Sequence, residues 1–201
     1  MSAGAVEAYP KLVEQILACQ KCGLCRTRTQ AVPGSGSITA ELMFVGEGPG
    51  KNEDEQGIPF CGASGKLLAE LLASIGLNRD QVFITNIVKC RPPDNRDPLP
   101  DEITSCAPYL QAQTDIIKPR VIATLGRYAL NHFLPNQKIS EAHGRALRHQ
   151  GQIFVPLYHP AVALYRASMK DELMADFQVI KKVLNKLAAE PDLAASQTAL
   201  I

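Results

Sequence analysis

The sequence lacks the features that would place it in a membrane or in a secretory pathway. None of its apolar runs is long enough to cross a bilayer, so we expect no membrane partner. Its N-terminus has no basic segment followed by an apolar one, so we expect a cytoplasmic, reducing location. Charge of one sign is not in excess either. The net charge is +1, and global charge therefore argues neither for nor against a nucleic-acid partner.

The composition is that of an ordinary globular protein. Hydrophobic residues make up 46% of the 201 residues and charged residues 20%, and the length suits one domain with a substantial core. No internal repeat is visible in the sequence. We expect residues 1–188 to form this domain. Residues 189–201 are alanine-rich and weakly patterned, so we expect them to form a disordered tail.

Short apolar segments alternate with segments of helical periodicity along the chain. Strands are predicted at residues 41–45, 82–88, 120–125 and 153–157. The main helices are predicted at residues 7–19, 64–75, 100–117, 127–133 and 170–187. This alternation indicates an α/β fold, a three-layer α/β/α sandwich around a mostly parallel sheet of four strands.

Four of the six cysteines have a layout typical of a metal centre. Cys19 and Cys22 form a Cys-x-x-Cys pair, and Cys90 and Cys106 follow as single residues. Thiolates are soft ligands that select iron–sulfur clusters, zinc or copper(I). A zinc ribbon normally supplies two close pairs, so this layout favours a [4Fe–4S] cluster over zinc. Spacing alone leaves Cys22 with Cys25 open as an alternative close pair.

Polar and glycine residues gather where the predicted strands end. The first strand leads into the turn Gly46-Glu-Gly-Pro-Gly50, which carries Glu47 and is followed by Glu53. Asn86 lies at the end of the second strand and His159 after the fourth. Any one of these residues alone is more often structural, but the carboxyl ends of parallel strands share one rim, where ligands bind. The turn matches neither a P-loop nor a Rossmann fingerprint.

Several collinear segments resemble those of family 4 uracil-DNA glycosylases, the iron–sulfur type common in bacteria and archaea. The matching segments are Gly46-Glu-Gly-Pro-Gly50 with Glu53-Asp54, Gly57-Ile-Pro-Phe-Cys-Gly62, Thr85-Asn-Ile-Val-Lys-Cys-Arg-Pro-Pro93, Asn95-Arg96, Pro98-Leu-Pro-Asp-Glu102 and His159-Pro160-Ala161. The resemblance covers about residues 19–184. It implies an enzyme that flips uracil out of DNA and hydrolyses its N-glycosidic bond, leaving an abasic site for base excision repair.

The resemblance also implies a cofactor and a mode of action. It assigns a structural [4Fe–4S] cluster to Cys19, Cys22, Cys90 and Cys106. Arg28-Thr29 lies at the family's distance from Cys22, which favours Cys19 over Cys25 as the fourth ligand. The expected partner is uracil-containing DNA, single- or double-stranded, and the family acts as a monomer.

The resemblance gives roles to the residues that would surround the flipped base. Phe60 would stack on uracil, and Asn86 would read its Watson–Crick edge. His159 would donate a hydrogen bond to uracil O2, where negative charge develops as the bond breaks. Backbone N–H groups of the turn that contains Gly46 and Gly48 would help, as an oxyanion hole does.

The group that activates water stays open at this level. Other uracil glycosylases have an aspartate where this chain has Gly48. Glu53 or Glu47 would orient water or stabilise the cationic sugar, and Glu47 has bracing of the turn as an alternative role.

Basic side chains near the expected site are candidates for phosphate contacts. They are Arg91 and Arg96 in one loop and Arg166 after His159, with a solvated surface arginine as the alternative for Arg166. Two other classes of function remain open. One is a non-catalytic iron–sulfur protein that binds DNA or senses redox state, and the other is a hydrolase that binds free nucleotides.

Overall fold

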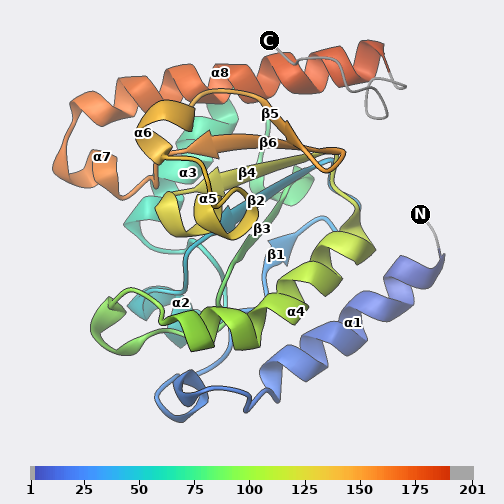
Figure 1. The fold of residues 1–201 in the computed structure, drawn as a ribbon, viewed down its shortest axis with the longest axis vertical. Coiled ribbons are helices and arrows are strands. Elements are labelled where there is room, and N and C mark those ends of the chain that lie inside the picture. The colour runs from blue at the N-terminus through green and yellow to red at the C-terminus, as the bar shows by residue number, and fades with distance from the viewer. Residues whose placement is uncertain (1–2, 191–201) are drawn as a thin grey trace.

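The computed structural model describes residues 3–190 and shows a central sheet between two layers of helices (Figure 1). The strand order is β1-β3-β2-β4-β6-β5. The four predicted strands form its parallel centre as β2 (Leu42–Gly46), β3 (Phe83–Asn86), β4 (Val121–Leu125) and β6 (Gln152–Leu157). The predicted three-layer α/β/α sandwich is therefore confirmed.

The sheet has six strands rather than the four expected. The two additional strands, β1 (Ser35–Gly36) and β5 (Leu147–His149), pair antiparallel at the two edges. Both are too short to show a periodic pattern in the sequence. The hairpin that joins β5 to β6 turns through Gln150 and Gly151, with φ of 47° and 81°, which suits the right-handed twist of the strands.

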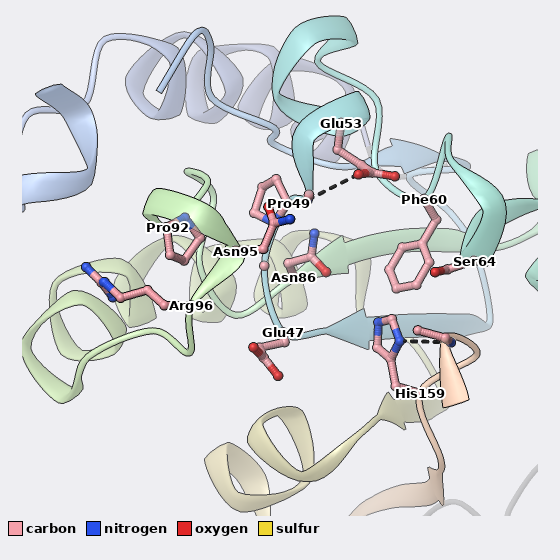
Figure 2. Close-up of a pocket in the computed structure, with 13 residues that line it drawn as sticks. Glu47, Pro49, Glu53, Phe60, Ser64, Asn86, Pro92, Asn95, Arg96 and His159 are labelled. Atoms are coloured by element: carbon pink, nitrogen blue, oxygen red, sulfur yellow. Dashed lines mark hydrogen bonds between the residues drawn. The ribbon is translucent and has the colours of Figure 1, made fainter. Parts of the chain in front are cut away.

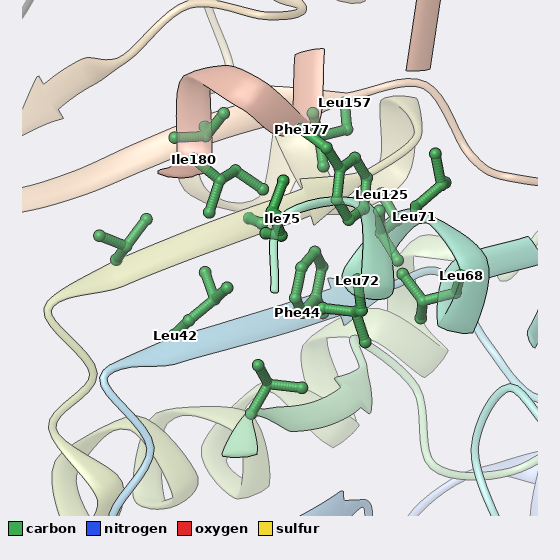
Figure 3. Close-up of a cluster of buried hydrophobic side chains, with 14 of the residues drawn as sticks. Leu42, Phe44, Leu68, Leu71, Leu72, Ile75, Leu125, Leu157, Phe177 and Ile180 are labelled. Carbon is green, nitrogen blue, oxygen red and sulfur yellow. The ribbon is translucent and has the colours of Figure 1, made fainter. Parts of the chain in front are cut away.

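Each central strand is buried on both faces, which explains why it reads as a continuous apolar run. Within β2, Leu42 and Phe44 pack on one side of the sheet, while Met43 and Val45 pack on the other. The first side is covered by α3 (Ala63–Ser74) and α8 (Ser168–Ala189), whose side chains fill the cluster in Figure 3. The opposite side is covered by α1 (Ala3–Leu17), α4 (Pro100–Ile117) and α5 (Arg127–Phe133).

Short helical turns occupy the connections near the carboxyl ends of the strands. They include α2 (Lys51–Gln56), α6 (Ile139–Ala142), α7 (Val162–Tyr165) and the 3-10 turns η1 (Gly23–Arg26) and η3 (Pro93–Asn95). A further 3-10 turn, η2 (Arg79–Gln81), directly precedes β3 at its amino end. Because β2, β3, β4 and β6 are parallel, the chain leaves all four at one rim. The register pairs Gly46 with Asn86 at this rim, so the glycine turn and the amide are neighbours.

The last helix, α8, extends to Ala189, one residue past the expected end of the domain. Residues 191–201 lie outside the described residues, so the disorder expected in the tail stays a prediction. Within residues 3–190, we find no helix with the length and apolar character that a bilayer span requires.

Candidate active site and cysteine site

A cavity of about 360 Å³ opens at the carboxyl rim of the sheet (Figure 2). It is lined by Glu47, Gly48, Pro49, Gly50, Glu53, Phe60, Ser64, Asn86, Pro92, Asn95, Arg96, His159 and Ala161. These residues come from the ends of β2, β3 and β6, from the connections that follow them, and from the first turn of α3. The structure therefore brings together the candidates that the sequence placed at separate strand ends.

Because Gly46 has no side chain, space remains between the Asn86 amide and the Phe60 ring. A Cβ atom at this position would overlap the Asn86 Oδ1 atom and would lie 2.8 Å from the Phe60 Cζ atom. Since real Cβ atoms do not approach other atoms so closely, any larger residue would push the amide and the ring apart. The backbone of Gly46 adopts an ordinary conformation that any residue could take. Glycine is therefore required here only because there is no room for a side chain.

Phe60 forms one wall of the cavity in an unusual backbone conformation. Its φ of 51° is left-handed, and Arg79 donates hydrogen bonds to the carbonyl oxygens of Pro59 (2.6 Å) and Phe60 (3.0 Å). The Phe60 ring stacks against His159, with centroids 5.5 Å apart and an interplanar angle of 29°. Hydrogen bonds from outside the pocket thus hold the aromatic wall in a strained position.

Asn86 presents an acceptor that has no partner in the described protein. The residue is 1% exposed, and no donor among residues 3–190 bonds to its Oδ1 atom. A buried carbonyl oxygen without a hydrogen bond is uncommon and costly. Because Asn86 lines the cavity, a ligand that carries an N–H group would supply the missing partner.

His159 is held as a neutral imidazole. Burial lowers its pKa to about 4, since the charged ring would lose its hydration. Its Nδ1 atom accepts a hydrogen bond of 3.2 Å from the Ala161 N–H. A neutral ring with an accepting Nδ1 carries its proton on Nε2. His159 therefore offers one N–H donor.

The carboxylate of Glu53 is occupied by the protein itself. Its Oε1 atom accepts hydrogen bonds from the N–H groups of Cys61 and Gly62, both 3.0 Å, and its Oε2 atom accepts one of 3.1 Å from Gly50. These bonds tie the glycine turn to the loop that follows Phe60. Figure 2 shows the one between Glu53 and the glycine turn. Glu53 therefore braces the turn, as was considered for Glu47, and the catalytic role of Glu53 stays a prediction.

The carboxylate of Glu47 is free by comparison. It makes no hydrogen bond to any residue in the described range 3–190, although it lines the cavity. Burial raises its pKa, the negative charge of Asp97 adds to the rise, and Arg127 opposes it. Glu47 is therefore a half-buried carboxylate that is available to water or substrate.

The three arginines expected to contact phosphate differ in the hydrogen bonds that their guanidinium groups already make within the protein. Arg96 makes a bidentate ion pair with Glu102, with distances of 2.9 and 2.6 Å, so its guanidinium is already engaged. The Arg91 Nε atom donates to Asn95 Oδ1 at 2.8 Å. Arg166 is exposed and follows Tyr165, which is 88% exposed. Arg166 lies outside the residues that line the cavity.

Four cysteines line a second, smaller cavity, between α1, the loop after β3 and α4. They are Cys19, Cys22, Cys90 and Cys106, while Cys25 is not part of its lining. All six cysteines are free thiols, so no disulfide uses them. Burial raises the pKa of Cys90 to about 11, although Arg28 opposes the rise, so this thiol stays protonated unless a metal centre binds the sulfur.

Hydrogen-bond donors surround these sulfur atoms. Arg28 donates to Cys90 Sγ at 2.9 Å, the Lys89 N–H to Cys106 Sγ at 3.3 Å, and the Lys21 N–H to Cys19 Sγ at 3.5 Å. Within residues 3–190, no three His, Cys, Asp or Glu side chains are spaced for a single metal ion. In a four-iron cluster each thiolate binds a different iron atom, and N–H groups bond to the sulfurs. The donor set fits such a cluster.

The family model of the uracil DNA glycosylase superfamily matches residues 33–188. The chain belongs to this superfamily. Among curated relatives, a type-4 uracil-DNA glycosylase from Sulfurisphaera tokodaii is 47% identical over 89% of this chain and 86% of its own length. The type-4 enzyme from Archaeoglobus fulgidus is 45% identical over 90% and 96%, respectively. A type-5 uracil-DNA glycosylase from Pyrobaculum aerophilum is 31% identical over 65% of each chain.

These relatives confirm the resemblance that the sequence motifs indicated. The structure adds residues of the pocket to which motif reasoning gave no role, namely Ser64 and Asn95. Asn95 lies inside a matching segment, so the signal was present without a role attached. The support that Arg79 gives to the Phe60 loop carried no sequence signal, because the two residues are far apart in the chain.

Proposed function

We propose that this protein is a monofunctional uracil-DNA glycosylase that flips uracil out of DNA and hydrolyses its N-glycosidic bond. The observation that carries the proposal is the unpaired Asn86 oxygen in a cavity beside the Phe60 ring and the neutral His159. Most of the chain is similar to proteins named type-4 uracil-DNA glycosylases, which supports the same activity. The product, an abasic site, belongs to base excision repair.

Recognition of the base rests on stacking and on one amide. Phe60 offers a face for the flipped base, and stacking of this kind tolerates any base. Asn86 provides the selection, since its Oδ1 accepts from uracil N3–H and its amino group donates to O4. Cytosine presents a bare N3 and an amino group at these positions. Each polar group left unpaired in the pocket costs about 1–3 kcal/mol.

Bond cleavage requires stabilisation of the leaving uracil. Negative charge develops on its O2 atom, and His159 donates its Nε2–H there. Because the ring is neutral around pH 7, it acts as a hydrogen-bond donor and transfers no full proton. Backbone N–H groups of the turn around Gly48 add to this field. Removal of one donor of this kind typically lowers the rate by about 10²–10³-fold.

The carboxylates of Glu47 and Glu53 have different roles in the proposed reaction. Glu47 orients the water that attacks the sugar, since this residue lines the cavity and its carboxylate accepts no hydrogen bond from the described residues. Glu53 holds the glycine turn against the Phe60 loop and is a positioning residue. The negative charge of both carboxylates also favours the oxocarbenium-like sugar of the transition state.

Cys19, Cys22, Cys90 and Cys106 hold a [4Fe–4S] cluster that supplies a structural cross-link. Their sulfurs join the end of α1 to α4 and to the loop after β3. Arg28 and the Lys89 N–H stabilise two of these thiolates. The cross-link orders residues 91–99, which carry three of the pocket residues, Pro92, Asn95 and Arg96.

Uracil-containing DNA, single- or double-stranded, lies across the carboxyl rim. Arg91, Arg96 and Arg166 contact its phosphates, which makes binding sensitive to salt without selecting a sequence. The exposed Tyr165 suits insertion beside the flipped nucleotide. The protein acts in the cytoplasm as a monomer.

The test is excision of uracil from a labelled oligonucleotide, single-stranded or with uracil opposite guanine, followed by alkaline cleavage of abasic sites. Strong losses are expected for Asn86→Ala and His159→Ala. His149→Ala serves as the control, because His149 is exposed on the edge strand β5 outside the pocket. If the iron-loaded wild-type protein releases no uracil, the non-catalytic DNA-binding function replaces this proposal.

A further inference from the structure

Lys89 carries a buried ammonium group that takes no direct part in the proposed reaction. The residue is 1% exposed, and among the described residues no carboxylate pairs with its ammonium. Burial of an ammonium ion is strongly unfavourable unless every proton finds a partner. A lysine in such a place therefore needs a compensating set of contacts.

The ammonium of Lys89 uses all three of its donors. They reach the Thr85 hydroxyl at 2.7 Å, the Asn86 carbonyl oxygen at 2.6 Å and Gln113 Oε1 at 2.7 Å. Gln113, fully buried on α4, donates in turn to the Pro33 carbonyl at 2.7 Å, and the Thr85 hydroxyl donates there at 2.9 Å. Satisfied networks of this kind hold their members in one arrangement.

The shortest of these bonds holds the residue whose side chain reaches the cavity. The main chain of Asn86 is bonded to Lys89 through its carbonyl oxygen, and the adjoining Ile87 N–H bonds to Gly46 at 2.9 Å. The Asn86 Oδ1 atom has no partner of its own among the described residues. The direction of that oxygen therefore depends on how firmly the Asn86 main chain is held.

We propose that Lys89 is a positioning residue for base recognition, which fixes the Asn86 main chain so that its carboxamide meets the uracil edge. The proposal rests on the proposed function and deepens it. The Lys89 N–H also bonds to Cys106 Sγ, so the same residue connects the cysteine site to the base-reading amide. Lys89 touches no substrate and acts only through Asn86.

The experiment is a double-mutant cycle that combines Lys89→Met and Asn86→Ala, because methionine keeps the length of the side chain without its charge. Single-turnover excision of uracil from single-stranded DNA is measured for all four proteins. Lys89→Met is expected to slow excision by about 10- to 100-fold in the presence of Asn86, the range for a charged hydrogen bond. In the Asn86→Ala background its effect is expected to fall below about threefold.

Inhibition by free uracil provides a readout that involves no chemistry. Lys89→Met is expected to weaken this inhibition, and Lys182→Met, which removes an exposed charge on α8, should leave both readouts unchanged. Gln113→Met loosens the hold on Lys89 and keeps the charge, so its effect should also disappear when Asn86 is absent. This second variant decides the question if Lys89→Met fails to fold.

Equal losses in both backgrounds, with unchanged inhibition by uracil, would overturn the role of Lys89 and leave the glycosylase function intact. A wild-type protein that does not excise uracil would instead overturn the proposed function, and the role of Lys89 with it. Iron content and melting temperature, measured on every variant, separate these results from loss of the fold.

Discussion

Acid should destabilise this protein through His159, because its folded and unfolded forms bind the proton at different pH. The folded pKa is about 4, whereas an unfolded histidine titrates at 6.5. Between these values the unfolded chain binds more protons, so stability falls as pH decreases from 6.5 towards 4. Linkage gives a loss of about 1.4 kcal/mol at pH 5.5 and about 2.6 kcal/mol at pH 4.5. These values are upper bounds, since His159 keeps partial contact with solvent.

The assay is urea unfolding of the wild-type protein and of His159→Gln at several pH values from 7 to 4.5. Glutamine does not titrate, so the difference between the two curves isolates His159 from carboxylates and from the cysteine site. The wild-type protein should lose more stability on acidification than the variant, by the amounts above. Parallel curves would refute the enclosed, neutral imidazole. The same reasoning predicts that the neutral donor persists through pH 6.5, so the excision rate should show no histidine titration there.

Three further results are expected. Glu53→Gln should lower the free energy of unfolding by about 1–3 kcal/mol in urea titrations and should slow excision. The reason is that the glutamine amide cannot accept all three backbone hydrogen bonds. Unchanged stability would contradict the bracing role of Glu53. Gly46→Ala should abolish inhibition by free uracil, because the added methyl group occupies the space for the base. Its affinity for abasic DNA, measured by fluorescence anisotropy, should stay within about threefold of the wild-type value. Equal loss of both would indicate a general distortion of the site. Cys106→Ser should contain less iron than the wild-type protein, whereas Cys25→Ser should contain as much, as measured by iron content and visible absorbance. Loss of iron from Cys25→Ser would instead make Cys25 a ligand.

The ion pair between Arg96 and Glu102 changes how the basic loop is understood. Sequence placed Arg96 near DNA as a free cation, but its guanidinium is bound by a carboxylate that also accepts a hydrogen bond from the Leu99 N–H at 2.8 Å. Arg96 therefore shapes the loop that closes one side of the pocket. Its contact with phosphate stays a prediction, in which the phosphate has to share the guanidinium with Glu102.

The sequence by itself determined the central sheet and the family. Strands buried on both faces must be apolar throughout, so β2, β3, β4 and β6 were visible as short runs between helical segments. The helices α4 and α5 were predicted with their observed bounds, since each follows a clear local boundary. The motifs at the strand ends were specific enough to indicate the superfamily, and polar residues at those ends were expected to share a rim.

Only the tertiary structure decided which partner each side chain has. It showed that Glu53 accepts hydrogen bonds from backbone N–H groups, whereas the Glu47 carboxylate accepts none from the described residues. The sequence of the turn and of the helix after it does not reveal this difference. It placed Cys19, and not Cys25, in the cavity that Cys22, Cys90 and Cys106 also line. It also buried Lys89 next to Asn86, with the ammonium bonded to the Asn86 carbonyl oxygen. The edge strands β1 and β5 also depended on pairing with segments far away in the chain. The physical reason is common to these cases: local pattern reports which surface of a segment is apolar, whereas hydrogen bonds and burial depend on what the fold brings against it.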